Sequence, residues 1–130
     1  MEIVHKVAAV ILQDRKMLLV RKGTSSTYVS PGGRPEPGES NPEVTLRRAL
    51  KGELSADIAR CRPFRVFTER ASSGEAQVLM DTYIVQLASP PKEGPAIADL
   101  VWVAANSSRP MAPIVKEHLL PALKEADLID

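Results

Sequence analysis

The chain has 130 residues, the size of one domain, and its 44% hydrophobic and 25% charged residues are typical of a soluble globular protein. This composition excludes a disordered chain, a collagen and a coiled coil. With 17 basic and 16 acidic residues the net charge is +1, so bulk charge does not favour binding to nucleic acid or to an anionic membrane.

Cysteine content and hydropathy indicate the expected compartment. Cys61 is the only cysteine, which excludes an internal disulfide and favours a reducing, cytoplasmic location. No apolar run approaches the roughly 20 residues that cross a bilayer. We therefore expect a cytoplasmic protein without a membrane partner.

The N-terminal region predicts a β-hairpin followed by a long loop. Residues 3–12 are almost all apolar and include several β-branched side chains, which favours a strand buried on both faces. A polar turn at 13–16 leads to a second strand at 17–20. Residues 23–40 are dense in glycine, proline and serine, and an unstructured loop of this length is usually functional or disordered.

A helix is predicted after this loop. Asn41 is a good N-cap, and Pro42 suits the first helical position. Leucines recur at four-residue spacing from Leu46 to Leu54. We expect the helix to span residues 42–56.

The second half of the chain predicts further strands and a closing helix. Its apolar patterns alternate with clusters of serine, glycine and proline. The expected elements are strands at 64–69, 76–87 and 100–103, a turn at 71–74, a loop at 89–95, and a helix over 110–128 kinked at Pro121.

Residues 32–54 contain the side chains that suggest chemistry. Glu36 and Glu39 lie in the glycine-rich loop, and the helix that follows contains Arg48 and Glu53. Acids and an arginine on converging elements can hold one another and a divalent ion. The alternative from composition is that these acids are ordinary solvated surface groups.

This segment resembles the Nudix box, G-x5-E-x7-R-E-U-x-E-E-x-G-U, in which U is aliphatic. Gly33, five residues and Glu39 match its opening, and residues 102–123 are similar to the tail of many Nudix hydrolases. The resemblance covers most of the chain. It implies one α/β domain over residues 1–130, with a mixed, curved sheet flanked by helices as an α/β/α sandwich.

The second half of the box fits in two registers. Direct counting from Gly33 places the box arginine at Arg47 and leaves no box acid in the helix. One extra residue within 40–42 places it at Arg48, with Glu53 as the last box acid. We favour this register because a loop absorbs an insertion readily whereas a helix cannot shift its faces. Ala49, Gly52 and Ser55 then stand where the box has two acids and a glycine.

The resemblance implies a hydrolase dependent on Mg2+ or Mn2+, acting on a nucleoside diphosphate linked to another group. Glu53, with Glu39 and the Gly32 carbonyl, would hold the metal, and Arg48 would pair with Glu39; the catalytic residues would be Glu53, Arg48 and Glu39. The loss of two acids predicts weakened metal binding. It also leaves open a catalytically inactive Nudix-fold module that binds a nucleotide or a protein. A homodimer is a further expectation from the family.

Other residues are candidates on weaker grounds. Each has a structural alternative: Trp102 equally suits the core, Tyr28 an exposed loop, and Glu69 an exposed strand end. His5, His118 and Cys61 lack metal or catalytic spacing and are expected to be structural or inert. The substrate-binding candidates are Tyr28, Arg34, Glu36, Trp102 and Glu69, and the candidates for a catalytic base are Glu69, Glu75 and Asp81.

Overall fold

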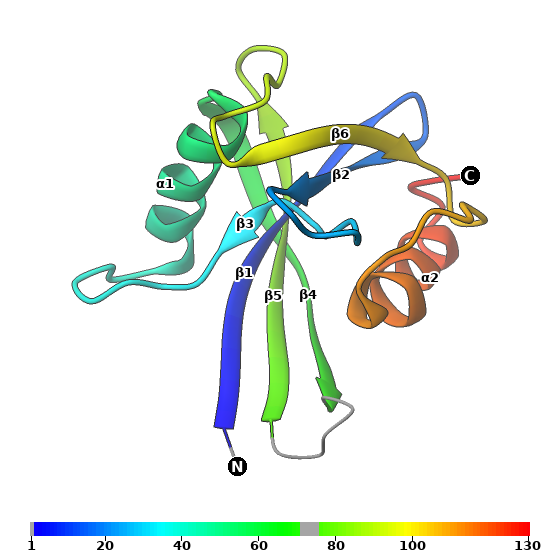
Figure 1. The fold of residues 1–130 in the computed structure, drawn as a ribbon, viewed down its shortest axis with the longest axis horizontal. Coiled ribbons are helices and arrows are strands. Elements are labelled where there is room, and N and C mark those ends of the chain that lie inside the picture. The colour runs from blue at the N-terminus through cyan, green and yellow to red at the C-terminus, as the bar shows by residue number, and fades with distance from the viewer. Residues whose placement is uncertain (1, 71–75) are drawn as a thin grey trace.

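A computed structural model describes residues 2–70 and 76–130, so the turn expected at 71–74 and the candidate Glu75 lie outside the described residues. Figure 1 shows a curved sheet with one helix on either side. The elements are β1 (Glu2–Gln13), β2 (Lys16–Lys22), β3 (Gly32–Gly33), α1 (Pro42–Leu54), β4 (Ile58–Arg70), β5 (Ala76–Leu87), β6 (Ile97–Val103), the π-helix η1 (Val115–Leu119) and α2 (Leu120–Glu125).

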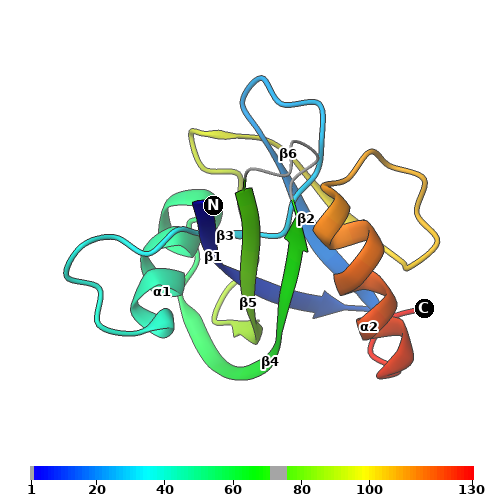
Figure 2. The ribbon, with the colours of Figure 1, turned by 90° about the horizontal axis from the view of Figure 1, so that it is seen from below.

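The sheet has the strand order β4-β5-β1-β2-β6, and β3 pairs with β1 beside this path. β1 runs parallel to β5, whereas the β1–β2, β1–β3, β2–β6 and β4–β5 pairs are antiparallel. Helices α1 and α2 lie on opposite sides of this mixed sheet in both ribbon views (Figures 1 and 2). The expected mixed α/β architecture is confirmed.

Strand β1 is shared by two hydrophobic clusters. Successive side chains of a strand point to opposite faces. Val7, Ala9 and Ile11 pack with the leucines of α1, whereas Ala8 and Val10 pack with the residues of η1 and α2. The strand is therefore buried on both faces along this stretch, as its uniform apolarity predicts.

Strand β4 begins at Ile58, earlier than the predicted start at residue 64. It lies at the edge of the sheet, and most of its side chains are exposed, so its first half lacks an apolar pattern. The pairing with β5 shifts between Pro63 and Val66. There the Arg65 N–H donates to Thr82 Oγ1 at 3.1 Å, and proline is tolerated at such edge irregularities.

The C-terminal helical segment is shorter than the predicted 110–128. Residues 110–112 are held instead by the loop at Tyr28: the Tyr28 N–H donates to the Pro110 carbonyl at 2.8 Å, and the Ala112 N–H donates to the Tyr28 carbonyl at 3.0 Å. Pro113 also disfavours a helical conformation at the residue before it. The predicted start was wrong because the helical spacing of apolar residues carries no information on the pairing of residues 110–112 with Tyr28.

The expected kink at Pro121 takes the form of a π-helical turn. Proline has no N–H to donate, and its ring crowds the carbonyl four residues earlier. The preceding turn is accordingly widened, and the Leu120 N–H donates to the Val115 carbonyl, five residues back. Within residues 2–70 and 76–130, none of the helices combines the length and apolarity required for a membrane span.

Candidate functional site

Helix α1 is delimited as its sequence predicts. The Asn41 side chain accepts a hydrogen bond from the Val44 N–H at 3.2 Å, and Pro42 is the first helical residue. The helix ends at Leu54, and Ser55 follows in the left-handed conformation with φ of 51°. Glycine adopts this conformation most readily. Since the register through Arg48 places the box glycine at Ser55, the cap geometry supports that register.

Glu39 connects the glycine-rich loop to α1. Arg48 Nε donates to Glu39 Oε2 at 2.6 Å, while Thr45 Oγ1 and the Glu36 N–H each donate to Oε1 at 2.8 Å. Arg48 Nη2 also donates to the Arg34 carbonyl at 2.8 Å. The Arg48 bond is the main cause that lowers the pKa of Glu39 to about 2. Both carboxylate oxygens of Glu39 therefore accept hydrogen bonds, and these contacts join the glycine-rich loop to α1.

We expect this network to make stability depend on pH. Glu39 has a pKa of about 2 in the fold, below its ordinary value of 4.5, so its charged form stabilises the protein above pH 4.5. That contribution disappears as pH falls from 4.5 through 2. Glu39→Gln should therefore lower the urea midpoint at pH 7, and its difference from wild type should shrink towards pH 2. Glu125→Gln, at an exposed position of α2, is the control. A difference that stays constant with pH would contradict this role.

Glu53 lies at the point where α1, β2 and β3 meet. Its Oε1 accepts the Gly32 N–H at 3.0 Å, and its Oε2 lies 2.9 Å from Lys22 Nζ. Only 13% of its side chain is exposed. The Gly94 N–H donates to the Glu53 carbonyl at 2.8 Å, which ties the loop before β6 to the last turn of the helix. Glu53, the remaining box acid, is thus held at its carboxylate by Gly32 and Lys22 and at its backbone carbonyl by Gly94.

Lys6 brings a second cation towards this point. Its Nζ donates to the Ser30 carbonyl at 2.6 Å. Burial lowers its pKa to about 8, as does the charge of Lys22, whereas the charge of Glu53 opposes the shift. We refer to Lys6, Lys22 and Glu53 as the lysine–glutamate cluster. Two lysines and one glutamate give it a formal charge of +1.

A cavity of about 600 Å³ adjoins the cluster through Lys6. It lies between the α2-side face of the sheet and residues 112–117. Its walls are mostly apolar and include Val78, Met80 and Ile114. The combination of an apolar cavity and a few polar groups is typical of small-molecule sites.

Glu69 and Glu117 line the same cavity on the side formed by β4 and η1. Glu69 Oε2 is hydrogen-bonded to His118 Nε2, and ligand atoms of Glu69, Glu117 and His118 lie within 4.8 Å of one another. The structure therefore brings the candidate Glu69 to the cavity. His118, expected on a free helix surface, contacts Glu69. The two residues are 49 positions apart in the sequence, so no local spacing pattern predicts this contact.

A model of the NUDIX domain matches residues 4–123 of the chain. The chain belongs to the NUDIX domain family. No curated protein sequence matches it significantly. The family match supports a Nudix hydrolase in general.

Several solved structures share the fold over nearly the whole chain. The E. coli ORF135 protein is 25% identical with a TM-score of 0.76, and the alignment covers 100% of this chain and 96% of that one. The MutT NUDIX hydrolase from Burkholderia pseudomallei is 19% identical with a TM-score of 0.76, covering 95% and 98% of the two chains. A UDP-X diphosphatase is 21% identical with a TM-score of 0.72, covering 98% of this chain and 64% of that one.

The donor set of this Nudix protein does not fit the magnesium cluster that the box implies. Mg2+ requires oxygen ligands. Ala49 is buried and Gly52 exposed on α1, and neither offers an oxygen from its side chain. Each carboxylate oxygen of Glu53 already faces a positively polarised donor: the Gly32 N–H lies at Oε1 and the Lys22 ammonium group at Oε2. The nearest charges would therefore oppose a dication.

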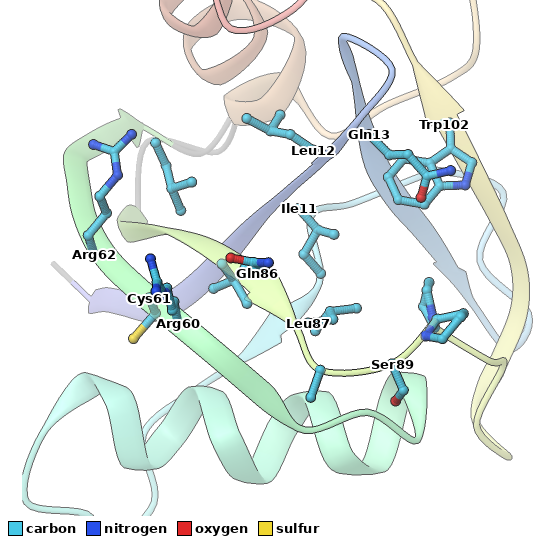
Figure 3. A pocket seen from close by; sticks show the side chains of 15 residues that line it. Ile11, Leu12, Gln13, Arg60, Cys61, Arg62, Gln86, Leu87, Ser89 and Trp102 are labelled. Carbon is cyan, nitrogen blue, oxygen red and sulfur yellow. The ribbon is translucent and has the colours of Figure 1, made fainter.

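Tyr28 and Trp102 do not lie at the lysine–glutamate cluster. Tyr28 is buried in the hydrophobic cluster beside α2, and its hydroxyl donates to Asp99. Its burial makes it part of the core, and it lines neither described cavity. Trp102 lines a separate cavity of about 910 Å³, whose lining residues also include Arg60 and Arg62 of β4, on the opposite side of the view in Figure 3.

The remaining predicted substrate and base residues are not brought to the cavity. Arg34 and Glu36 are exposed in the loop around Arg48, where Arg48 Nη1 lies 3.5 Å from Glu36 Oε1. Asp81 is partly buried on β5, and burial raises its pKa. It lines neither described cavity. Glu69 and Asp81 are the two base candidates that the structure describes, and of these only Glu69 adjoins the cavity.

Proposed function

We propose that this Nudix protein hydrolyses the pyrophosphate bond of a nucleoside diphosphate linked to another group. The observation that carries the proposal is the position of the lysine–glutamate cluster next to an apolar cavity, with Lys6 belonging to both. The net positive cluster matches a diphosphate, and the cavity matches the apolar faces of a nucleoside. Family membership supports a pyrophosphohydrolase in general.

The cluster suggests a role for each of its side chains. Lys6 and Lys22 donate hydrogen bonds to the phosphate oxygens and offset their charge, which favours attack on phosphorus. Glu53 accepts a proton from the attacking water as a general base. The water oxygen forms a new bond to phosphorus, and the bridging P–O bond breaks. The products are a nucleoside monophosphate and a second phosphate compound.

Dependence on Mg2+ or Mn2+ remains a prediction from the family. No step described above uses the metal, because the donor set around Glu53 does not fit it. Assays with magnesium, with manganese and with a chelator measure this dependence directly.

Glu53→Gln should lower turnover at least about 100-fold, the effect usual for loss of a general base. The measurement is phosphate or pyrophosphate release from nucleoside triphosphates and from nucleoside diphosphates esterified to a sugar or a second nucleoside. Glu125→Gln, on the exposed face of α2, is the matched control and should keep wild-type turnover. Undiminished turnover by the Glu53 variant would contradict the assigned role.

A second candidate is a Nudix module that binds a nucleotide without cleaving it. The observation in its favour is that Ala49 and Gly52 occupy two positions at which the box has acids. Wild-type protein that binds members of the nucleotide panel, yet releases no phosphate under any metal condition, would favour this module over the hydrolase.

A further inference from the structure

The face of α1 that holds the box positions has one carboxylate, that of Glu53, and the ammonium group of a lysine pairs with it. Ala49 and Glu53 are four residues apart and therefore share a helix face. Lys22, from the end of β2, places its Nζ 2.9 Å from Glu53 Oε2. A protein ammonium group thus lies where a full box would provide ligands for a dication.

We propose that Lys22 and Lys6 substitute for the divalent cation, so that this site binds a diphosphate directly, without metal. The proposal rests on the diphosphate site of the proposed function. It goes beyond that function by assigning the counter-charge of the ligand to two lysine side chains.

The positions of the two lysines support this assignment. Lys6 is one of the residues that line the cavity, and its Nζ donates to the carbonyl of Ser30, another lining residue. The side chain of Lys22 is 46% exposed, so part of it is open to an incoming anion, whereas only 13% of the Glu53 side chain is exposed. An ammonium group is a compact charge that binds phosphate through three rotatable donors. Partial burial strengthens such contacts because the local dielectric is lower than that of water.

The charge balance argues against a metal at the same place. A dication beside Glu53 would meet two ammonium charges and a single carboxylate. It would compete with Lys22 for the negative charge of Glu53, and Mg2+ gives up its own water reluctantly. A diphosphate, in contrast, is attracted by both lysines and repelled by one acid.

Calorimetric titration with inorganic pyrophosphate tests the proposal, once with EDTA and once with magnesium. We expect the Kd in EDTA to lie within about threefold of the Kd in magnesium. Lys22→Met should weaken binding in EDTA by at least about tenfold, the usual effect of losing a charge-assisted hydrogen bond. Lys22→Arg should retain most of the affinity. Lys16→Met, at the opposite exposed end of the same strand, should bind like wild type.

Two results would overturn the proposal: binding that occurs only with magnesium, or Lys22→Met that binds as tightly as wild type in EDTA. Circular dichroism checks that each variant is folded, and Lys6→Met provides a second, independent removal of charge. The test is separate from that of hydrolysis. Binding of pyrophosphate in EDTA without any turnover would support the lysine site and contradict the proposed function. Turnover in magnesium without binding in EDTA would support the proposed function and contradict the lysine site.

Discussion

Gly32→Ala should destabilise the protein by at least about 3 kcal/mol, from overpacking and backbone strain together. Gly32 pairs with Ala8 of β1, and a Cβ on Gly32 would lie 2.1 Å from the Val7 carbonyl oxygen and 2.9 Å from Ala8 Cα. These are backbone atoms of a buried strand and cannot move aside as a flexible side chain would. The φ of Gly32 is also +147°, which side-chain-bearing residues rarely adopt.

The same substitution should weaken pyrophosphate binding, because the Gly32 N–H holds Glu53 in place. Urea unfolding measures the first effect and calorimetry of the folded fraction measures the second. Gly38→Ala is the matched control: Gly38 has a φ of +87°, but a Cβ there meets nothing within 4 Å. It should cost only about 1–2 kcal/mol. Equal losses for both variants would mean that strain alone, rather than the contact with β1, determines the effect.

Gly94→Ala should cost about 2–3 kcal/mol and disturb the same site from the opposite side. A Cβ on Gly94 would lie 2.0 Å from the Gly52 carbonyl oxygen and 3.0 Å from that of Glu53. The loop before β6 would have to separate from the end of α1, breaking the Gly94 N–H bond to Glu53. We therefore expect weaker binding of pyrophosphate in addition to lower stability.

Gly52→Ala is the control for Gly94→Ala, because Gly52 is the residue whose carbonyl oxygen the new Cβ on Gly94 would meet. A Cβ on Gly52 meets nothing within 4 Å, and alanine is favoured over glycine in a helix by up to about 1 kcal/mol. Gly52→Ala should therefore stabilise the protein slightly and leave binding intact. If Gly94→Ala were as stable as wild type in urea, the packing of this loop on α1 would not be what holds Glu53.

The elements that the sequence predicts well are those determined by local patterns. The apolar run of β1 predicts a strand buried on both faces, and Asn41 and Pro42 predict the start of α1. The left-handed Ser55 supports the register that the box resemblance leaves open. In each case the deciding interaction lies within a few residues, or in the general requirement to bury apolar surface.

The features that the sequence does not predict depend on contacts between distant segments. The first half of β4 pairs only along one edge and has no apolar alternation to reveal it. The ion pair of Lys22 with Glu53 joins a strand to a helix, and neither side chain shows a pattern on its own. A lysine at the end of a strand is ordinarily solvated, so its ion pair with a distant acid becomes visible only in the folded structure.

Successive side chains of β1 belong to two different hydrophobic clusters. The support of Glu53 and the shape of the cavity therefore depend on different clusters. The leucines of α1 support Glu53 from one face of the strand, whereas Met80 and Val115 shape the cavity from the other. On the proposed function, substitutions of Met80 or Val115 in the cavity wall would change which nucleoside is accepted while Glu53 and Lys22 keep their positions. Such a layout allows specificity to diverge between relatives by changes on a single side of the sheet.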